Sequence, residues 1–167
     1  MRRLLVLLAL AVLALAVGAP DANAKANANA NACGEAKRAR PSKRAVPGRP
    51  PLIIGDSVLL GAVDEVAGVG YEVNTRGCRQ MSEGLRLLAS RRGRLPSLVA
   101  IMLGANGEMA PGQIRKAMRI IGPDRVLRLV TPRRNPRAAR QMRAAARRYR
   151  GRVAVIDWAA YTAGRSE

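Results

Sequence analysis

The sequence predicts an α/β fold of three layers (α/β/α), in which helices cover both faces of a five-stranded parallel sheet. Five short apolar runs look like buried strands, and the third and fourth are rich in Val, Ile and Leu without polar alternation. Helix-compatible segments separate the runs, and this alternation is typical of a parallel sheet. The predicted strands are Leu52–Ile54, Tyr71–Thr75, Leu98–Leu103, Val126–Thr131 and Val153–Asp157.

Four helices are expected between these strands. Ser82 is a candidate N-cap for the second helix, and Pro111 stands at a plausible first position of the third. The expected helices are Val58–Ala67, Ser82–Arg92, Pro111–Ile121 and Pro136–Arg150.

The domain is expected to begin only after two N-terminal segments. Residues 1–24 have two arginines, an apolar run over 4–17 and Ala-Asn-Ala at 22–24, which is the pattern of a secretory signal peptide. The run is shorter than the ~20 residues of a membrane span. Residues 25–50 are Ala/Asn-rich and then Arg/Pro-rich, which predicts a disordered linker. Residues 51–167 remain as the domain, and the chain is expected to be secreted or to lie in the cell envelope.

The formal net charge is +19, with 26 Arg among the 30 basic residues. Such a charge fits nucleic acid or an anionic envelope polymer. A GC-rich gene also explains it, because Ala, Gly, Pro and Val are plentiful and Phe is absent. The chain has only four aromatic residues, so it lacks a stacking platform for single strands, and nucleic acid is disfavoured. Cations on the last helix are interpreted as a solvated face: Arg140, Arg143, Arg147 and Arg150.

Cys33 and Cys78 are the only cysteines. In an exported chain such a pair indicates one disulfide, and the alternative is two independent thiols. The chain has no histidine, so no metal-ligand cluster is expected, and no cofactor is predicted.

Three places follow the first three strands, at the edge of a parallel sheet where ligand sites lie. Ser57, in Gly55-Asp56-Ser57, is either a nucleophile or an ordinary helix N-cap. The turn around Gly77 and Cys78 offers backbone N–H groups or is simple loop geometry. The side chain of Asn106 offers an amide donor, although Asn-Gly is also a strong turn pair.

Taken in order, the three places resemble the SGNH hydrolase superfamily, also called GDSL esterases and lipases, in its bacterial exported type. The resemblance runs from Leu52 to the chain end and rests on three blocks and on "VIDW". The blocks are Gly55-Asp56-Ser57, Gly77-Cys78-Arg79-Gln80 and Gly104-Ala105-Asn106.

The resemblance implies a flavodoxin-like SGNH fold and acyl-ester chemistry. Ser57 would be the nucleophile. The Ser57 N–H, a backbone N–H of Gly77 or Cys78, and the Asn106 amide would form the oxyanion hole. The reaction would hydrolyse or transfer an acyl group, with O-acetyl on envelope carbohydrate as one candidate substrate.

The family's Asp-x-x-His motif has no counterpart here. Asp157 is followed three residues later by Ala160, so we do not assign Asp157 a catalytic role. The last helix of the family fold is also expected to be missing. Either a truncated sequence or a non-catalytic relative explains this departure. The alternatives to an impaired esterase are a cleft-binding module and a basic protein that holds anionic wall polymer.

Overall fold

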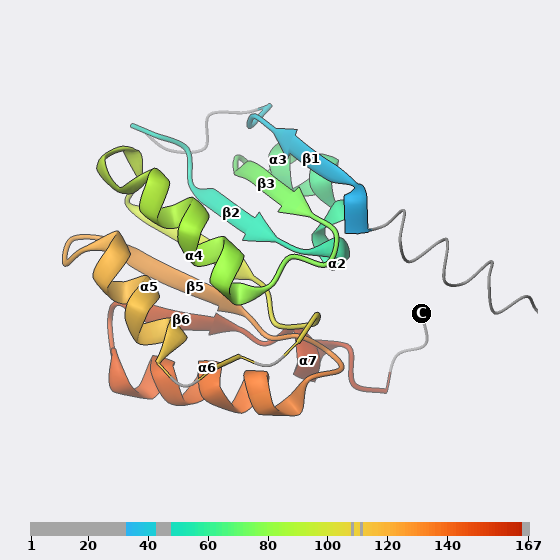
Figure 1. Ribbon diagram of the computed structural model, residues 1–167, viewed down its shortest axis with the longest axis vertical. Coiled ribbons are helices and arrows are strands. Elements are labelled where there is room, and N and C mark those ends of the chain that lie inside the picture. The colour runs from blue at the N-terminus through green and yellow to red at the C-terminus, as the bar shows by residue number, and fades with distance from the viewer. Residues whose placement is uncertain (1–32, 43–47, 108, 111, 165–167) are drawn as a thin grey trace, which may run out of the picture. The chain divides into compact units, whose positions relative to one another are not determined.

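The structure is a computed structural model that describes residues 33–42, 48–107, 109–110 and 112–164 (Figure 1). Its strands form one six-stranded sheet in the order β1-β3-β2-β4-β5-β6. All neighbouring pairs from β3 to β6 are parallel, which confirms the α/β prediction. The parallel strands are β2 (Leu52–Gly55), β3 (Glu72–Arg76), β4 (Leu98–Met102), β5 (Val126–Val130) and β6 (Val153–Ile156).

A sixth strand, β1 (Ala36–Ala39), corrects the prediction of five. It pairs with β3 in the antiparallel direction, with Ala36 opposite Arg76 and Ala39 opposite Val73. The strand lies in the segment that was expected to be a disordered linker. Its four residues have low intrinsic β propensity, so pairing with β3 determines their conformation.

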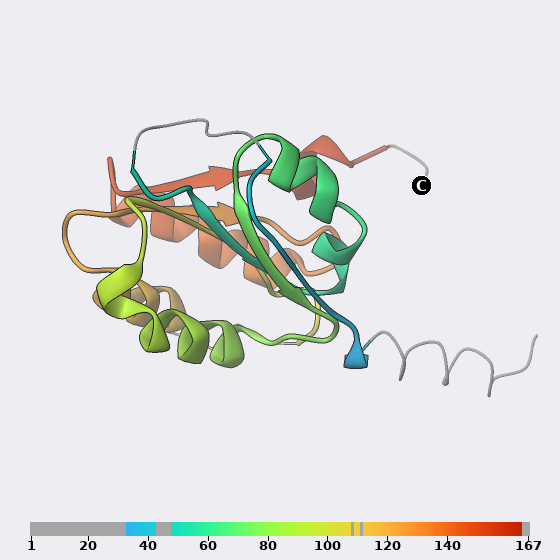
Figure 2. The ribbon, with the colours of Figure 1, turned by 90° about the horizontal axis from the view of Figure 1, so that it is seen from above.

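Helices cover both faces of the sheet (Figures 1 and 2). The larger core cluster lies under α4, α5 and α6 and contains Leu52, Ile101 and Leu127. The smaller cluster lies under α2 and α3 and includes Ile53 and Val73. The helices are α2 (Ser57–Leu60), α3 (Val63–Gly68), α4 (Met81–Ser90), α5 (Gln113–Ile121), α6 (Pro136–Arg148) and α7 (Trp158–Tyr161).

The first two expected helices differ from the observed ones. The first is divided into two short helices, since α2 ends at Leu60 with Gly61 as its C-cap and α3 begins at Val63. Gln80, not Ser82, precedes the first turn of α4, and no side chain caps it. Pro136 occupies the first turn of α6 as expected. Pro111 lies outside the described residues.

Candidate active site

Ser57 is the first residue of α2, immediately after β2, and it is partly buried. The N-cap is Asp56, whose Oδ1 accepts a hydrogen bond from the Val58 N–H at 3.1 Å. The interpretation of Ser57 as the cap is therefore wrong by one residue. A Cβ at Gly55 would lie 2.5 Å from the Leu59 side chain, so this tight turn requires glycine. The Ser57 hydroxyl makes no hydrogen bond to any residue that the structure describes.

The strand-to-helix turn is fixed from both sides by buried bonds to Asp56. The Thr75 hydroxyl donates to the Asp56 carbonyl at 2.6 Å, and the Asp56 N–H donates to the Met102 carbonyl at 3.3 Å. Asp56 itself is only 1% exposed. Burial raises the pKa of its carboxyl, and the N–H groups of Val58 and Ala105 partly offset this.

The turn after β3 distinguishes the two predicted backbone donors. The Gly77 N–H already donates to the Glu35 carbonyl at 2.9 Å. The Cys78 N–H takes part in no hydrogen bond among the described residues. Cys78 is also the one non-glycine residue there with a positive φ, at 55°. The geometry thus favours Cys78 over Gly77 as a donor to a ligand.

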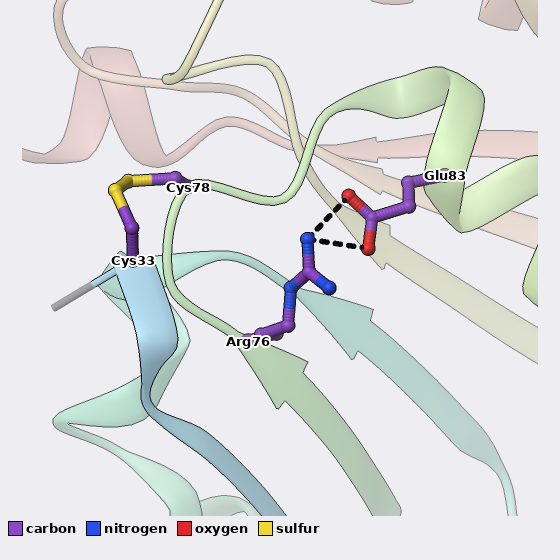
Figure 3. Close-up of a disulfide and its surroundings, with 4 residues drawn as sticks. All are labelled: Cys33, Arg76, Cys78 and Glu83. Atoms are coloured by element: carbon purple, nitrogen blue, oxygen red, sulfur yellow. Dashed lines mark hydrogen bonds and ion pairs between the residues drawn. A yellow bond between two sulfur atoms is a disulfide. The ribbon is translucent and has the colours of Figure 1, made fainter. Parts of the chain in front are cut away.

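Covalent and ionic contacts hold this turn in place (Figure 3). Cys33 and Cys78 form a disulfide with Cα atoms 4.8 Å apart, which confirms the predicted pairing. On the other side of the turn, Arg76 at the end of β3 pairs with Glu83 of α4 at 2.8 Å. These two contacts link the turn to the segment before β1 and to α4.

Arg79 is a buried arginine that sequence reasoning did not single out as functional. Its guanidinium donates to the carbonyl of Gly55 at 3.2 Å, to the carbonyl of Asn74 at 2.7 Å and to Asn74 Oδ1 at 2.9 Å. Burial lowers its pKa from the ordinary value. These bonds join Gly55, at the end of β2 and two residues before Ser57, to Asn74 of β3.

The loop after β4 carries the third predicted group. The Nδ2 atom of Asn106 is buried and has no hydrogen-bond partner among the residues that the structure describes. Asn135 holds the loop from outside, because its Nδ2 donates to the carbonyls of Gly104 at 2.8 Å and Gly107 at 3.1 Å. The same Asn135 caps α6 by accepting from the Ala138 N–H at 3.0 Å.

Strand register brings the three segments to one edge of the sheet. Gly55 lies opposite Thr75 on one side and Met102 on the other, so the segments leave the sheet at the same level. The loops also touch one another. The Ala105 N–H lies close enough to the Asp56 carboxyl to lower its pKa. A Cβ at Gly107 would lie 3.7 Å from Gln80 Nε2.

A cavity of about 290 Å³ opens beside this edge, on the side of β4 and β5. Residues on either side of Ser57 form one wall, and the segment after β5 forms another. Sequence reasoning missed this cavity because its walls come from four separate segments. The lining residues are Asp56, Val58, Met102, Leu103, Ala105, Val130, Thr131, Pro132, Arg133, Arg134 and Trp158.

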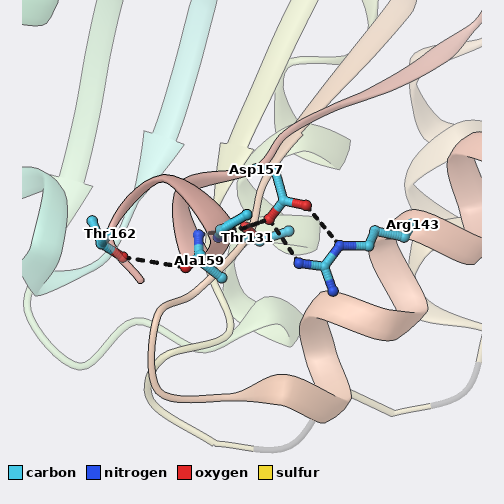
Figure 4. A network of polar contacts seen from close by, with 6 residues as sticks. Thr131, Arg143, Asp157, Ala159 and Thr162 are labelled. Atoms are coloured by element: carbon cyan, nitrogen blue, oxygen red, sulfur yellow. Dashed lines mark hydrogen bonds and ion pairs between the residues drawn. The ribbon is translucent and has the colours of Figure 1, made fainter. Parts of the chain in front are cut away.

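Asp157 is bound in a structural network beside the cavity (Figure 4). Its carboxylate accepts from Arg143 Nε at 2.7 Å and Nη2 at 2.8 Å, and from the Thr131 hydroxyl at 2.9 Å. The Arg143 hydrogen bonds hold the pKa of Asp157 far below its ordinary value. A carboxylate held in this way is a poor proton acceptor. Asp157 also caps α7 through the Ala160 N–H at 3.2 Å.

The part of the chain that the structure describes contains no group of three His, Cys, Asp or Glu side chains that could hold a metal ion. None of its helices is long and apolar enough to cross a bilayer.

Comparison with known proteins gives a likeness in fold. No protein-family model and no curated protein matches the chain. Among solved structures, the chain is similar to the C-terminal catalytic domain of peptidoglycan O-acetyltransferase A (OatA) of Streptococcus pneumoniae, solved with a methylsulfonyl adduct. The two are 22% identical over 68% of this chain and 71% of that one, with a TM-score of 0.59. The chain therefore shares the α/β/α fold of that domain.

Proposed function

We propose that this edge of the sheet is an acyl-ester site in which Ser57 is the nucleophile. The observation that carries the proposal is the unpartnered Nδ2 of Asn106, in a loop that adjoins the Asp56–Ser57 turn. Leaving a buried donor without a partner costs about 1–3 kcal/mol. Such a donor is typical of a site whose acceptor arrives with the ligand.

In this proposal, the Ser57 hydroxyl attacks the carbonyl carbon of the ester. The negative charge that develops on the carbonyl oxygen is stabilised by the Asn106 amide and by the N–H groups of Ser57 and Cys78. The carbon–oxygen bond to the alcohol then breaks, and the alcohol leaves with a proton. Water completes hydrolysis of the acyl-serine, whereas a sugar hydroxyl completes transfer.

Proton removal from the Ser57 hydroxyl is expected to be slow, because no described side chain is placed to act as its base. The chain has no histidine, and Asp157 is bound by Arg143. In Asp56, Oδ1 caps α2, and the buried Oδ2 makes no hydrogen bond to Ser57 or to any other described residue. Sites that lack one member of a catalytic triad keep only about 10³–10⁴-fold acceleration over water. We therefore expect slow acylation of Ser57 and little turnover.

An O-acylated envelope carbohydrate is the substrate class that we favour. The signal-like N-terminus supports it, and so does the similarity of fold to a peptidoglycan O-acetyltransferase domain. The cavity beside Ser57 is lined by apolar side chains such as Val58, Leu103 and Val130 together with polar ones such as Asp56 and Thr131, which suits an acyl group carried on a polar carbohydrate.

The test separates nucleophilicity from turnover. The full chain is treated with methanesulfonyl fluoride, in which attack of the Ser57 oxygen on sulfur expels fluoride, and the adduct is located by mass spectrometry. We expect slow labelling at Ser57 that is faster when free imidazole supplies a base. Asn106→Ala should slow labelling about 100-fold, as loss of one oxyanion donor does. Ser57→Ala is the control, and labelling that persists in it would contradict the assignment.

A non-catalytic cleft-binding module is the second candidate, favoured by the lack of a histidine base. It predicts no Ser57 adduct even with imidazole. It also predicts that an acetylated muropeptide perturbs the amide NMR signals of Ala105 and Asn106 without being cleaved.

A further inference from the structure

We infer that the outer face of α5 and α6 is a binding surface for an extended phosphodiester polymer that carries no bases. This surface, called the basic face below, differs from the proposed ester site. Six of its cations have no carboxylate partner among the described residues. They are Arg115, Lys116, Arg119, Arg140, Arg147 and Arg148.

Positive charge is concentrated in the C-terminal part of the domain, which contains α5 and α6. Residues 113–152 contain fourteen cations and one carboxylate, Asp124, whereas residues 52–107 contain six arginines and five carboxylates. A GC-rich gene would raise arginine in both parts, but it would not remove carboxylates from one part alone. Composition therefore does not explain the basic face.

Repulsion between cations on the same helix face destabilises α5 and α6. Arg115 and Arg119 are four residues apart on α5, and Arg143 and Arg147 are four apart on α6. Like charges at this spacing repel and destabilise a helix. Of these four, only Arg143 has a carboxylate partner among the described residues. A bound polyanion would relieve the repulsion among the others.

The shape of the surface indicates the form of the ligand. A groove of about 420 Å³ lies between the two helices, with Arg115 on one side and Arg148 on the other. The exposed length of α6 is about 20 Å, from its thirteen residues. The walls of the groove include the small side chains of Ala144 and Ala145, so a narrow flexible chain can lie close to the helix surface.

Chemistry distinguishes this ligand from a membrane and from nucleic acid. The described large apolar side chains that are exposed lie elsewhere, at Val58, Val69, Ile156, Trp158 and Tyr161, so α5 and α6 have no apolar face to insert into lipid. The groove has one aromatic residue, Tyr149, which gives bases no platform for stacking. Seven of the eight cations on the two helices are arginine, whose planar fork matches phosphate oxygens.

The test measures binding of fluorescein-labelled poly(glycerol phosphate), long enough to span α6, to the full chain. Arg140→Gln/Arg147→Gln/Arg148→Gln is compared with Arg86→Gln/Arg92→Gln/Arg94→Gln, which removes three exposed arginines elsewhere. The α6 triple variant should bind at least about 10-fold more weakly at low salt. Its slope of log K against log salt should be shallower by about 2, for three lost contacts at ~0.7 each. The matched variant should stay within about 2-fold of wild type, since its cations make no contact.

Equal weakening by both triple variants would overturn the proposal, because it would show only diffuse attraction. Tighter binding of polygalacturonate or of single-stranded DNA with equal charge would overturn the choice of ligand. Binding of uncharged dextran should be undetectable. Ser57→Ala should bind the polymer like wild type, so this result is independent of the ester-site proposal.

Discussion

The part of the domain that builds the candidate site and the part that carries the charge are made in different ways. In residues 52–107, Asp56, Thr75 and Arg79 are buried, and Thr75 and Arg79 both donate to backbone carbonyls of the turn after β2. In residues 113–152, most cations lie on the outer faces of α5 and α6. The first part thus positions chemistry through buried bonds and backbone turns. In residues 113–152, each helix packs one face against the sheet and exposes its other face to solvent.

Loss of the disulfide should be the largest single effect, and it falls on the first part. Cys33→Ser should lower the free energy of unfolding by about 4 kcal/mol, because the bridge closes a loop with a sequence separation of 45. Urea denaturation measures the change. Cys33→Ser/Cys78→Ser should lose no more than the single variant. A loss under about 1 kcal/mol would mean that the β1–β3 pairing alone holds the turn.

Removing the buried guanidinium of Arg79 should come next. Arg79→Met leaves the Gly55 and Asn74 carbonyls without a buried donor, so we expect a loss of about 3 kcal/mol in urea denaturation. Arg91→Met is the control, since Arg91 pairs with Glu72 near the surface and should cost less than about 1 kcal/mol. Equal losses would contradict the view that buried bonds determine the first part.

Asn135 connects the two parts, and its two roles can be separated. Asn135→Ala removes the α6 cap and both bonds to the loop after β4, and should cost about 1–2 kcal/mol. Asn135→Asp keeps an acceptor for the Ala138 N–H but loses the donor to Gly104 and Gly107. Hydrogen exchange of residues 104–107 should therefore rise in both variants, while helix stability recovers only with Asp. Unchanged exchange would show that the loop is held by other contacts.

The smallest effects should be opposite pH dependences at two aspartates. Because the pKa of Asp56 is raised in the folded protein, its contribution to the free energy of unfolding is fully present below the ordinary carboxyl pKa of about 3.9. This contribution is lost as pH rises through the raised pKa. Asp56→Asn should thus be as stable as wild type or more stable at pH 7, because Asn also caps a helix. The depressed pKa of Asp157 gives the reverse: its contribution is present above about pH 3.9 and is lost as pH falls further.

Melting curves of the two Asp→Asn variants against pH measure this contrast. Asp157→Asn should be less stable than wild type at neutral pH and should approach it in acid. Any gain in stability of Asp56→Asn over wild type at neutral pH should become smaller in acid. Parallel curves for the two variants would refute the pairing of Asp157 with Arg143 in solution.

Sequence patterns were sufficient for the parallel strands and for the sheet edge at which the segments after β2, β3 and β4 leave, because apolar runs and strand order determine both. The roles of Ser57, Cys78 and Asn106 at this edge stay predictions. They were insufficient for β1, whose Ala-Lys-Arg-Ala has no apolar alternation and is a strand only beside β3. The cap of α2 was missed by one residue, since Asp and Ser cap equally well. The Asn135-Pro136 pair was a usable signal for the α6 cap and was overlooked.

The short strand β1 also determines which side of the sheet is available to other chains. It occupies the outer edge of β3, and its four residues include Lys37 and Arg38, which are exposed. Short, charged edge strands discourage a second sheet from adding to the first. Because the neighbouring Cys33 is bonded to Cys78, this protection is permanent only in an oxidising compartment. After reduction, only its pairing with β3 would keep β1 in place, and loss of that pairing would leave β3 as an open edge for strand-to-strand self-association.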